Sequence, residues 1–320
     1  MTANPRAWYT MPGDAEAAKP EDFDYTFYPH YYPDPFVSYV GQPTPPGQIA
    51  SDRAAGKTCV RMLGDSTIAA SGICQQVEGM LHGHGWKAAV HNAGVIAANA
   101  NIMLSTMIHR VVDSRPDITI IVSGGIDALS PLQFDPRPGY PHIHALKEVF
   151  FEHFYDSARS SIWIDKPPLT TDKLRTDYFA KLASLRREYQ HLSPAWEMAI
   201  VETYRGAIRK TLALAVGSNL KLVYALAPLL PFKQSRTAAE AAALPPAKTM
   251  AYLARVYSGM SRALADEAAR YKDSPNIRVA DLHALFAHEK GEAFSDVIHW
   301  TPLGRTVVAN ALVELVAPWR

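Results

Sequence analysis

From residue 57 onward, short and almost continuously apolar runs alternate with longer stretches of helical periodicity. Continuous apolar runs are typical of strands that are covered on both faces, and alternation with helices favours a parallel sheet. The sequence therefore predicts an α/β fold for residues 57–320, a three-layer, doubly wound sheet of about five parallel strands. The expected strands are Thr58–Leu63, Lys87–Asn92, Asp117–Ser123, Leu220–Ala227 and Ile277–Asp281.

Two further segments flank or interrupt this pattern. Residues 1–56 are rich in proline and aromatic residues, which predicts an extended N-terminal arm packed on the main domain. The stretch between Pro131 and Ser218 is too long for one crossover, so we expect a helical insertion at about 133–194 that covers or shapes a site at the strand ends. The helices expected in this stretch are His142–Ala158, Asp172–His191 and, as the crossover that follows the insertion, Ala195–Val216.

Composition excludes several classes of function. A formal net charge of +1 gives no overall attraction to nucleic acid or to an anionic membrane. Two cysteines are too few for a disulfide framework, and no apolar run is long enough for a membrane span or a signal peptide. No glycine-rich phosphate-binding motif follows a strand. We therefore expect a cytoplasmic protein without a cofactor, and the sequence leaves its oligomeric state open.

A serine follows the first expected strand, in Gly64-Asp65-Ser66. The carboxyl ends of parallel strands form the ligand crevice of open α/β sheets, and a helix N-terminus there favours an oxyanion. Serine is also a preferred N-cap residue. On this stretch alone, Ser66 is either a nucleophile or a cap of the helix that continues to Gly83.

A serine nucleophile needs a base and a group that orients the base. Asp296 and His299 are three residues apart, after the last expected strand and before a helix expected to begin at Thr301-Pro302. This spacing allows the Asp296 carboxylate to reach Nδ1 of His299 within one turn. Alone, the pair is more typical of a surface turn, but its position after the last expected strand, in a chain with a serine at another strand end, favours the catalytic interpretation.

Four short blocks in order resemble the SGNH hydrolases, also called the GDSL family. These blocks are Gly64-Asp65-Ser66, Asn92-Ala93-Gly94, Gly124-Gly125-Ile126-Asp127 and Asp296-Val297-Ile298-His299. The resemblance implies a flavodoxin-like fold and a serine esterase that acts through an acyl-enzyme on a small-molecule or carbohydrate-linked acyl ester.

The same resemblance implies a role for each residue of the site. Ser66 would be the nucleophile, His299 the general base and Asp296 the residue that orients it. The N–H groups of Ser66 and Gly94 would donate to the oxyanion of the tetrahedral intermediate. An O-acyltransferase could use the same site.

Position 126 departs from the family pattern. The family has an asparagine there as a third oxyanion donor, and the isoleucine of this chain has no side-chain N–H. One such donor contributes about 2.7–4 kcal/mol to transition-state stability. Three explanations are open. The side chain of Asn99 or Asn101 could replace the missing donor, or the enzyme could cleave an activated ester with two backbone donors only. Alternatively, the protein could have kept the fold as a non-catalytic binding protein.

A metal site has little support in the sequence. His142 and His144 have the spacing of a metal-binding pair on a strand, but the local pattern is helical and puts them on different faces. No third ligand is evident, so we expect no metal.

Overall fold

The computed structural model describes residues 32–34, 38–40, 47–142, 144–159 and 170–320. Most of the expected N-terminal arm lies outside the described residues. A short antiparallel pair is described within it, β1 (Tyr32–Asp34) with β2 (Ser38–Val40). The expectation of extended chain is wrong at residues 48–54, which form helix α1 (Gln48–Ala54). This segment lacks the prolines of the residues before it and places Ile49 in the core.

The expected sheet is confirmed, with five parallel strands in the order β4-β3-β5-β6-β7. The first strand of this sheet, β3, therefore lies inside it, with β4 added on one side and β5 to β7 on the other. The boundary between β3 and β5 is the topological switch point, where open α/β sheets bind ligands. The strand bounds are β3 (Thr58–Leu63), β4 (Ala88–Asn92), β5 (Ile118–Ser123), β6 (Lys221–Leu226) and β7 (Ile277–Asp281).

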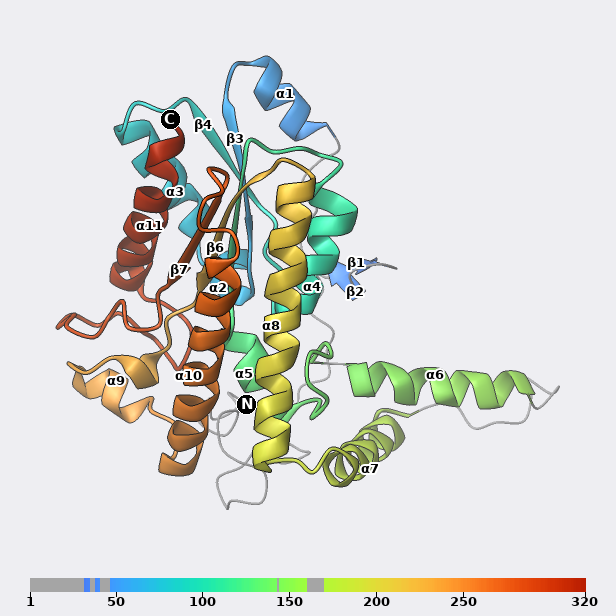
Figure 1. The fold of residues 1–320 in the computed structure, drawn as a ribbon. Coiled ribbons are helices and arrows are strands. Elements are labelled where there is room, and N and C mark those ends of the chain that lie inside the picture. Colours follow the sequence, from blue (N-terminus) through green and yellow to red (C-terminus); the bar gives the residue numbers. More distant parts are fainter. Residues whose placement is uncertain (1–31, 35–37, 41–46, 143, 160–169) are drawn as a thin grey trace.

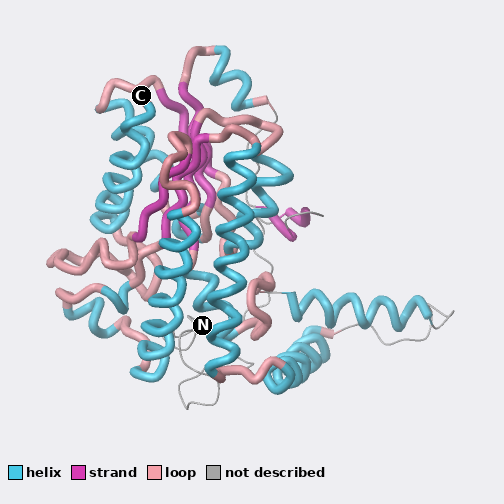
Figure 2. Tube along the Cα trace, viewed as in Figure 1, coloured by secondary structure: helices cyan, strands magenta, loops and turns pink. Residues whose placement is uncertain are grey.

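Helices cover both faces of the sheet and make three layers (Figures 1 and 2). On one face, α3 (Ile73–Gly83) and α11 (Pro302–Val316) bury residues such as Val77 and Leu312 against the strands. The other face is covered by helices that include the expected crossover: α4 (Ala100–Thr106) with its π-helical continuation Met107–Val111, α5 (Gly125–Gln133), α8 (Pro194–Gly217) and α10 (Ala247–Ala269).

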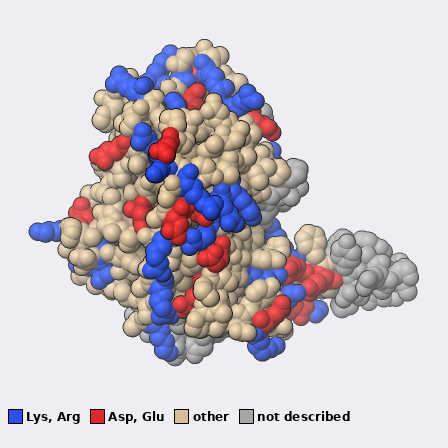
Figure 3. Space-filling model, in the orientation of Figure 1, with Lys and Arg blue, Asp and Glu red and all other residues tan. Residues whose placement is uncertain are grey.

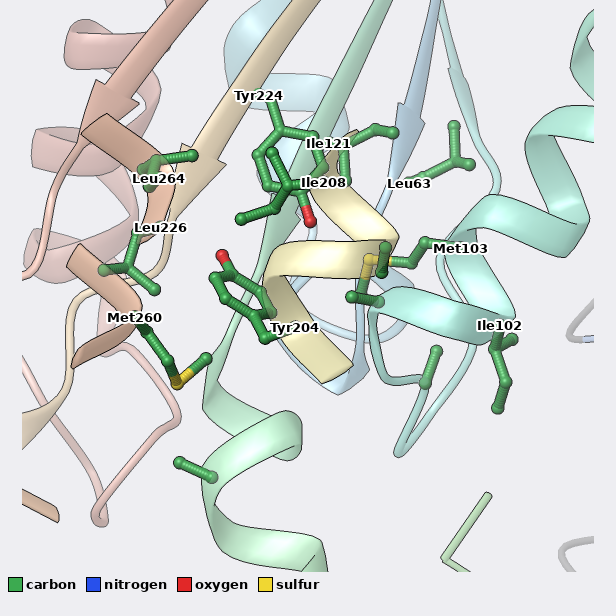
Figure 4. Close-up of a cluster of buried hydrophobic side chains, with 14 of the residues drawn as sticks. Leu63, Ile102, Met103, Ile121, Tyr204, Ile208, Tyr224, Leu226, Met260 and Leu264 are labelled. Atoms are coloured by element: carbon green, nitrogen blue, oxygen red, sulfur yellow. The ribbon is translucent and has the colours of Figure 1, made fainter. Parts of the chain in front are cut away.

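Successive residues of one strand point into different cores. In β5, Ile120 packs with the α3 and α11 side and Ile121 with the α4, α8 and α10 side, as the period of two in a strand requires. Figure 4 shows the second core, where Tyr204 of α8 and Tyr224 of β6 turn their hydroxyl ends toward one another. Both hydroxyls bond to Ser123 Oγ, at 3.2 and 2.8 Å, so this buried polar cluster is satisfied.

The helical insertion contains two helices, as expected, α6 (His144–Arg159) and α7 (Thr171–Glu188). They pack on each other through a small cluster of their own, and α6 extends away from the body of the domain (Figure 1). The chain leading into α6 is joined to α8 by Trp196, whose Nε1 donates to Pro136 O at 2.6 Å. A buried ion pair between Arg137 and Asp135 lies within the segment itself.

Short elements complete the domain after β6. They are a 3-10 turn, η4 (Leu230–Phe232), the helix α9 (Ala238–Ala242) and a C-terminal 3-10 turn, η5 (Ala317–Trp319). On the face seen in Figure 3, positive and negative side chains are interspersed. Ion pairs such as Arg205–Asp266 and Arg255–Glu197 join α8 to α10. Within the described ranges, no helix has both the length and the apolar character needed to cross a membrane.

Candidate active site

Ser66 lies at the carboxyl end of β3, in the first turn of the four-residue helix α2 (Ser66–Ala69). Asp65 is the N-cap of this helix, because its Oδ1 accepts from Thr67 N at 2.8 Å and from Thr67 Oγ1 at 2.7 Å. Ser66 is therefore the first helical residue and not the cap. Its side chain is free to take part in another interaction.

The single helix expected from residue 66 to Gly83 is wrong, because the structure breaks it into α2 and α3. The break lies at Gly72, which has φ +78° and precedes α3. A left-handed residue cannot continue a right-handed helix, and glycine adopts it without steric cost. Ser66 therefore lies on a short turn of helix of its own.

The structure brings Ser66, His299 and Asp296 into one line of hydrogen bonds. Ser66 Oγ lies 2.7 Å from His299 Nε2, and His299 Nδ1 lies 2.7 Å from Asp296 Oδ2. The three side chains come from the two ends of the described domain, 233 residues apart between serine and histidine. Ser66 is 9% exposed, whereas 41% of the His299 side chain is accessible, so the line reaches the surface at its histidine.

Asp296 is held by its own loop. Its Oδ1 accepts from the backbone N–H groups of Ile298 and His299 at 2.9 and 2.8 Å, which leaves Oδ2 for the imidazole. Burial raises the pKa of the Asp296 carboxyl, but the hydrogen bond and the charge of His299 outweigh burial, so the pKa is lowered. The carboxyl is therefore ionised at neutral pH.

The same pair changes the pKa of His299. The hydrogen bond to Asp296 raises it above its usual value of 6.5, against the effect of burial, and the Asp65 carboxyl below the site contributes in the same direction. A base with a raised pKa holds a transferred proton more readily. The arrangement can thus accept a proton from Ser66 Oγ and stabilise the imidazolium that results.

Gly94 forms a hydrogen bond within its own turn and offers no free N–H. Its N–H already donates to Asn92 Oδ1 at 2.9 Å, and the Nδ2 of Asn92 donates to Ile68 O and Ala69 O at 3.1 Å each. A Cβ at position 94 would come within 2.5 Å of Ala69 N. Gly94 therefore serves a close backbone contact between the end of β4 and α2, which corrects its expected role.

The two asparagines expected as substitute donors are also occupied. Asn99 caps α4 by accepting from Ile102 N at 3.0 Å, and its Nδ2 donates to Gly139 O and Tyr140 O. It is 2% exposed. Asn101 donates to Gly139 O at 3.1 Å. Both side chains hold the chain before α6, so the expectation that either replaces the asparagine at position 126 is wrong for Asn99 and unsupported for Asn101.

Asp127 joins the N-termini of α4 and α5. Its carboxyl accepts from Ala100 N at 3.0 and 3.1 Å and from Gly124 N at 3.3 Å. Burial raises the pKa of Asp127 to about 7, although these N–H groups act in the opposite direction. Ile126, beside it, is partly buried against the core on the α8 side. The loop thus keeps its shape without a side-chain donor at position 126.

Sequence reasoning missed a strained turn next to Ser66. Val95 N donates to Gly64 O and Ala98 N to Val95 O, which places a turn over residues 95–98 beside the β3–α2 junction. Ala97 in this turn has φ +56°, an uncommon conformation for a residue other than glycine. Such residues cluster at functional sites, but nothing in the sequence around an alanine indicates one.

A metal centre has no support in the described part of the chain. No group of three or more histidine, cysteine, aspartate or glutamate side chains there could hold an ion. His144 instead lies 3.5 Å from Glu148 and edge-on to Tyr140.

Comparison with known proteins gives matches at the level of solved structures only. No family model and no curated protein matches the chain. The chain is similar to LAE5, an alpha/beta hydrolase from the metagenome of Lake Arreo, with 12% identity, 82% of this chain and 96% of that chain covered, and a TM-score of 0.46. It is also similar to a lipase/acylhydrolase from Enterococcus faecalis, with 15% identity, 82% and 96% covered and a TM-score of 0.45.

A G-D-S-L family lipolytic protein from Desulfitobacterium hafniense is also similar to this chain. The identity is 15%, 81% of this chain and 99% of that chain are covered, and the TM-score is 0.42.

Proposed function

We propose that this chain is a serine-dependent ester hydrolase that acts through an acyl-enzyme. The observation that carries the proposal is the line of hydrogen bonds from Ser66 Oγ through His299 to Asp296, with 2.7 Å at each step. Nucleophile, base and orienting carboxylate at such distances are the arrangement that activates a serine hydroxyl. The site stands at the end of β3, next to the switch point of the sheet.

In the first half-reaction, Ser66 Oγ attacks the carbonyl carbon of the ester while its proton moves to His299 Nε2. The resulting oxyanion collapses, the bond to the alcohol oxygen breaks, and His299 returns the proton to that oxygen. The acyl group remains as an ester of Ser66. Asp296 stays ionised and balances the charge on the imidazolium.

In the second half-reaction, water takes the place of the alcohol. His299 Nε2 accepts a proton from the water as its oxygen attacks the acyl carbon, and then gives it to Ser66 Oγ when the acid leaves. A hydroxyl group of a small molecule or a carbohydrate could take the place of water, which would make the same site an acyltransferase. Esters of such alcohols are the substrates to test.

The oxyanion would be bound mainly by backbone N–H groups. The N–H of Ser66 is in the first turn of α2, where no intrahelical acceptor exists. The N–H of Ala97 has no acceptor within the described chain and belongs to the strained turn beside the same junction. We assign the N–H groups of Ser66 and Ala97 as the oxyanion donors, with Ala97 in place of Gly94.

Covalent labelling tests the proposal directly. A fluorophosphonate probe should modify the parent protein at Ser66, and both Ser66→Ala and His299→Ala should abolish labelling. Ser261, whose Oγ donates to Asp281, offers a matched control because Ser261→Ala should leave labelling unchanged. A folded parent protein that takes up no probe would refute the esterase proposal.

Ile126 motivates a second candidate, a binding protein on the same fold. Without a side-chain donor at this position, the transition state loses a contribution of about 2.7–4 kcal/mol. Ile126→Asn is expected to raise the rate of ester hydrolysis by about a hundredfold to a thousandfold if the amide reaches the oxyanion. A parent without activity, together with tight binding of an uncleaved ester, would favour the binding protein.

A further inference from the structure

A fully buried ion pair lies behind the loop that carries Asp296 and His299. Lys233 Nζ is 2.6 and 2.7 Å from the two carboxylate oxygens of Glu240, and both side chains have no exposed surface. Lys233 follows η4, and Glu240 belongs to α9. Burying two charges costs several kcal/mol per ion, and an apolar pair often stabilises a core as well or better. Stability alone is a weak reason for this pair.

Glu240 also binds three backbone N–H groups. Thr237 N donates to Oε2 at 2.9 Å, while Ala293 N and Phe294 N donate to Oε1 at 2.8 and 3.1 Å. Lys233 uses a further N–H on Gly291 O. Two consecutive N–H groups on one oxygen are bound best by a negative charge. The pair therefore joins α9 to residues 291–294.

Residues 291–294 are the first leg of what we call the base loop, residues 291–301. Phe294 forms an antiparallel bridge with Trp300, and Thr301 N donates to Ala293 O at 2.9 Å. Ser295 N donates to His299 O at 2.9 Å. Ala293 and Phe294, which Glu240 binds, thus also pair with Thr301 and Trp300, the two residues that follow His299.

The base loop is closed in from other directions as well. Leu230 N, three residues before Lys233, donates to Val297 O at 3.0 Å. A Cβ added to Gly304, in the first turn of α11, would lie 2.1 Å from Ala293 O. The base loop is therefore in close contact with α11, and Glu240 is bound to it through the N–H groups of Ala293 and Phe294.

We propose that Lys233 and Glu240 form a positioning pair, which keeps the base loop where His299 Nε2 meets Ser66 Oγ. This inference rests on the proposed function for its catalytic consequence. A displacement of about 1 Å in a reacting group can lower a rate by about a hundredfold. Glu240 acts through the backbone of the loop and does not touch the substrate.

The test compares two neutral replacements of the pair. In Lys233→Met with Glu240→Gln, the amide oxygen still accepts from Ala293 and Phe294. In Lys233→Met with Glu240→Leu, no acceptor remains, and neither variant leaves an unpaired buried charge. The first keeps an acceptor for the loop and should label with fluorophosphonate at least about tenfold faster than the second, which should label more slowly than the parent, with each variant assayed below its unfolding midpoint.

Controls separate positioning from stability. Glu197→Gln breaks the Arg255–Glu197 pair on the far helices and should leave the labelling rate unchanged. If the leucine variant does not fold, Glu240→Asp serves instead, because it keeps the charge and shortens the reach to the loop. Equal labelling rates in the glutamine variant and in either the leucine or the aspartate variant would overturn the positioning role.

A readout that needs no catalysis distinguishes this inference from the proposed function. Hydrogen exchange at the backbone N–H groups of Phe294 and His299 should be at least about tenfold faster in the leucine variant, or in Glu240→Asp, than in the glutamine variant. A parent without labelling refutes the esterase proposal only. Unchanged exchange at both N–H groups refutes the positioning pair only.

Discussion

Replacing Asp296 by asparagine should be more damaging than removing its side chain. The Oδ1 of Asp296 accepts from Ile298 N and His299 N, so the oxygen of an asparagine will occupy this place and its NH2 group will face His299. An N–H that points at Nδ1 makes this nitrogen an acceptor, and the neutral imidazole then carries its proton on Nε2. A protonated Nε2 cannot take the proton of Ser66.

The magnitude follows from this change of tautomer. The corresponding aspartate-to-asparagine substitution in serine proteases lowers kcat by about 10⁴-fold, or about 5.5 kcal/mol in the transition state. Asp296→Ala imposes no tautomer, so its rate should be about tenfold to a hundredfold higher than that of the asparagine variant. Because asparagine keeps the acceptor for both N–H groups, its melting temperature should stay within about 2 °C of the parent.

The assay is the second-order rate of fluorophosphonate labelling, checked by steady-state hydrolysis of an activated ester. Thermal unfolding of each variant serves as the control for structure. An asparagine variant that retains more than about a tenth of the parent rate, or an alanine variant slower than the asparagine variant, would refute this account of Asp296.

The remaining predictions concern pH and packing. The labelling rate of the parent should rise with pH to a midpoint above 6.5, because Asp296 raises the pKa of His299 and only the unprotonated imidazole acts as base; a midpoint at or below 6.5 would contradict the pair. Burial raises the pKa of Asp127 to about 7 from 3.8, so its contribution to stability is present below 3.8 and is lost as pH rises through 7. The unfolding free energy of the parent should therefore contain a decrease of at most about 4 kcal/mol between pH 3.8 and 7 that is due to Asp127. This decrease should be absent in Asp127→Asn, as measured by urea unfolding at each pH. Gly94→Ala forces a Cβ against Ala69 N and should lower the unfolding free energy by about 1–3 kcal/mol in the same assay, whereas an unchanged value would show that this contact is loose.

The sheet could be predicted from the sequence because a strand covered on both faces leaves a local signal. The runs that begin at Thr58 and Ile277 match β3 and β7 residue for residue. The break at Gly72 was missed because the apolar positions from Ile68 to Leu81 fit one continuous helix, and a single glycine is compatible with a helix as well as with a break.

The site was harder to predict, because it depends on hydrogen bonds between distant segments. The spacing of Asp296 and His299 is local and could be read, whereas the occupation of the Gly94 N–H by Asn92 could not. Thr237 and Glu240 form a capping box that is visible in the sequence, but that motif indicates only the start of α9. Nothing local indicates that Glu240 also binds Phe294.

The separation of Ser66 from His299 along the chain has a consequence for biosynthesis. Ser66 follows the first strand of the sheet to leave the ribosome, while His299 follows the last strand and needs the docking of α11 behind it. Under the proposed function, Ser66 therefore has no base during synthesis until the sheet is complete. Labelling of Ser66 by a fluorophosphonate probe would then report the docking of the segment that carries His299. A chain that ends before residue 299 would not be labelled.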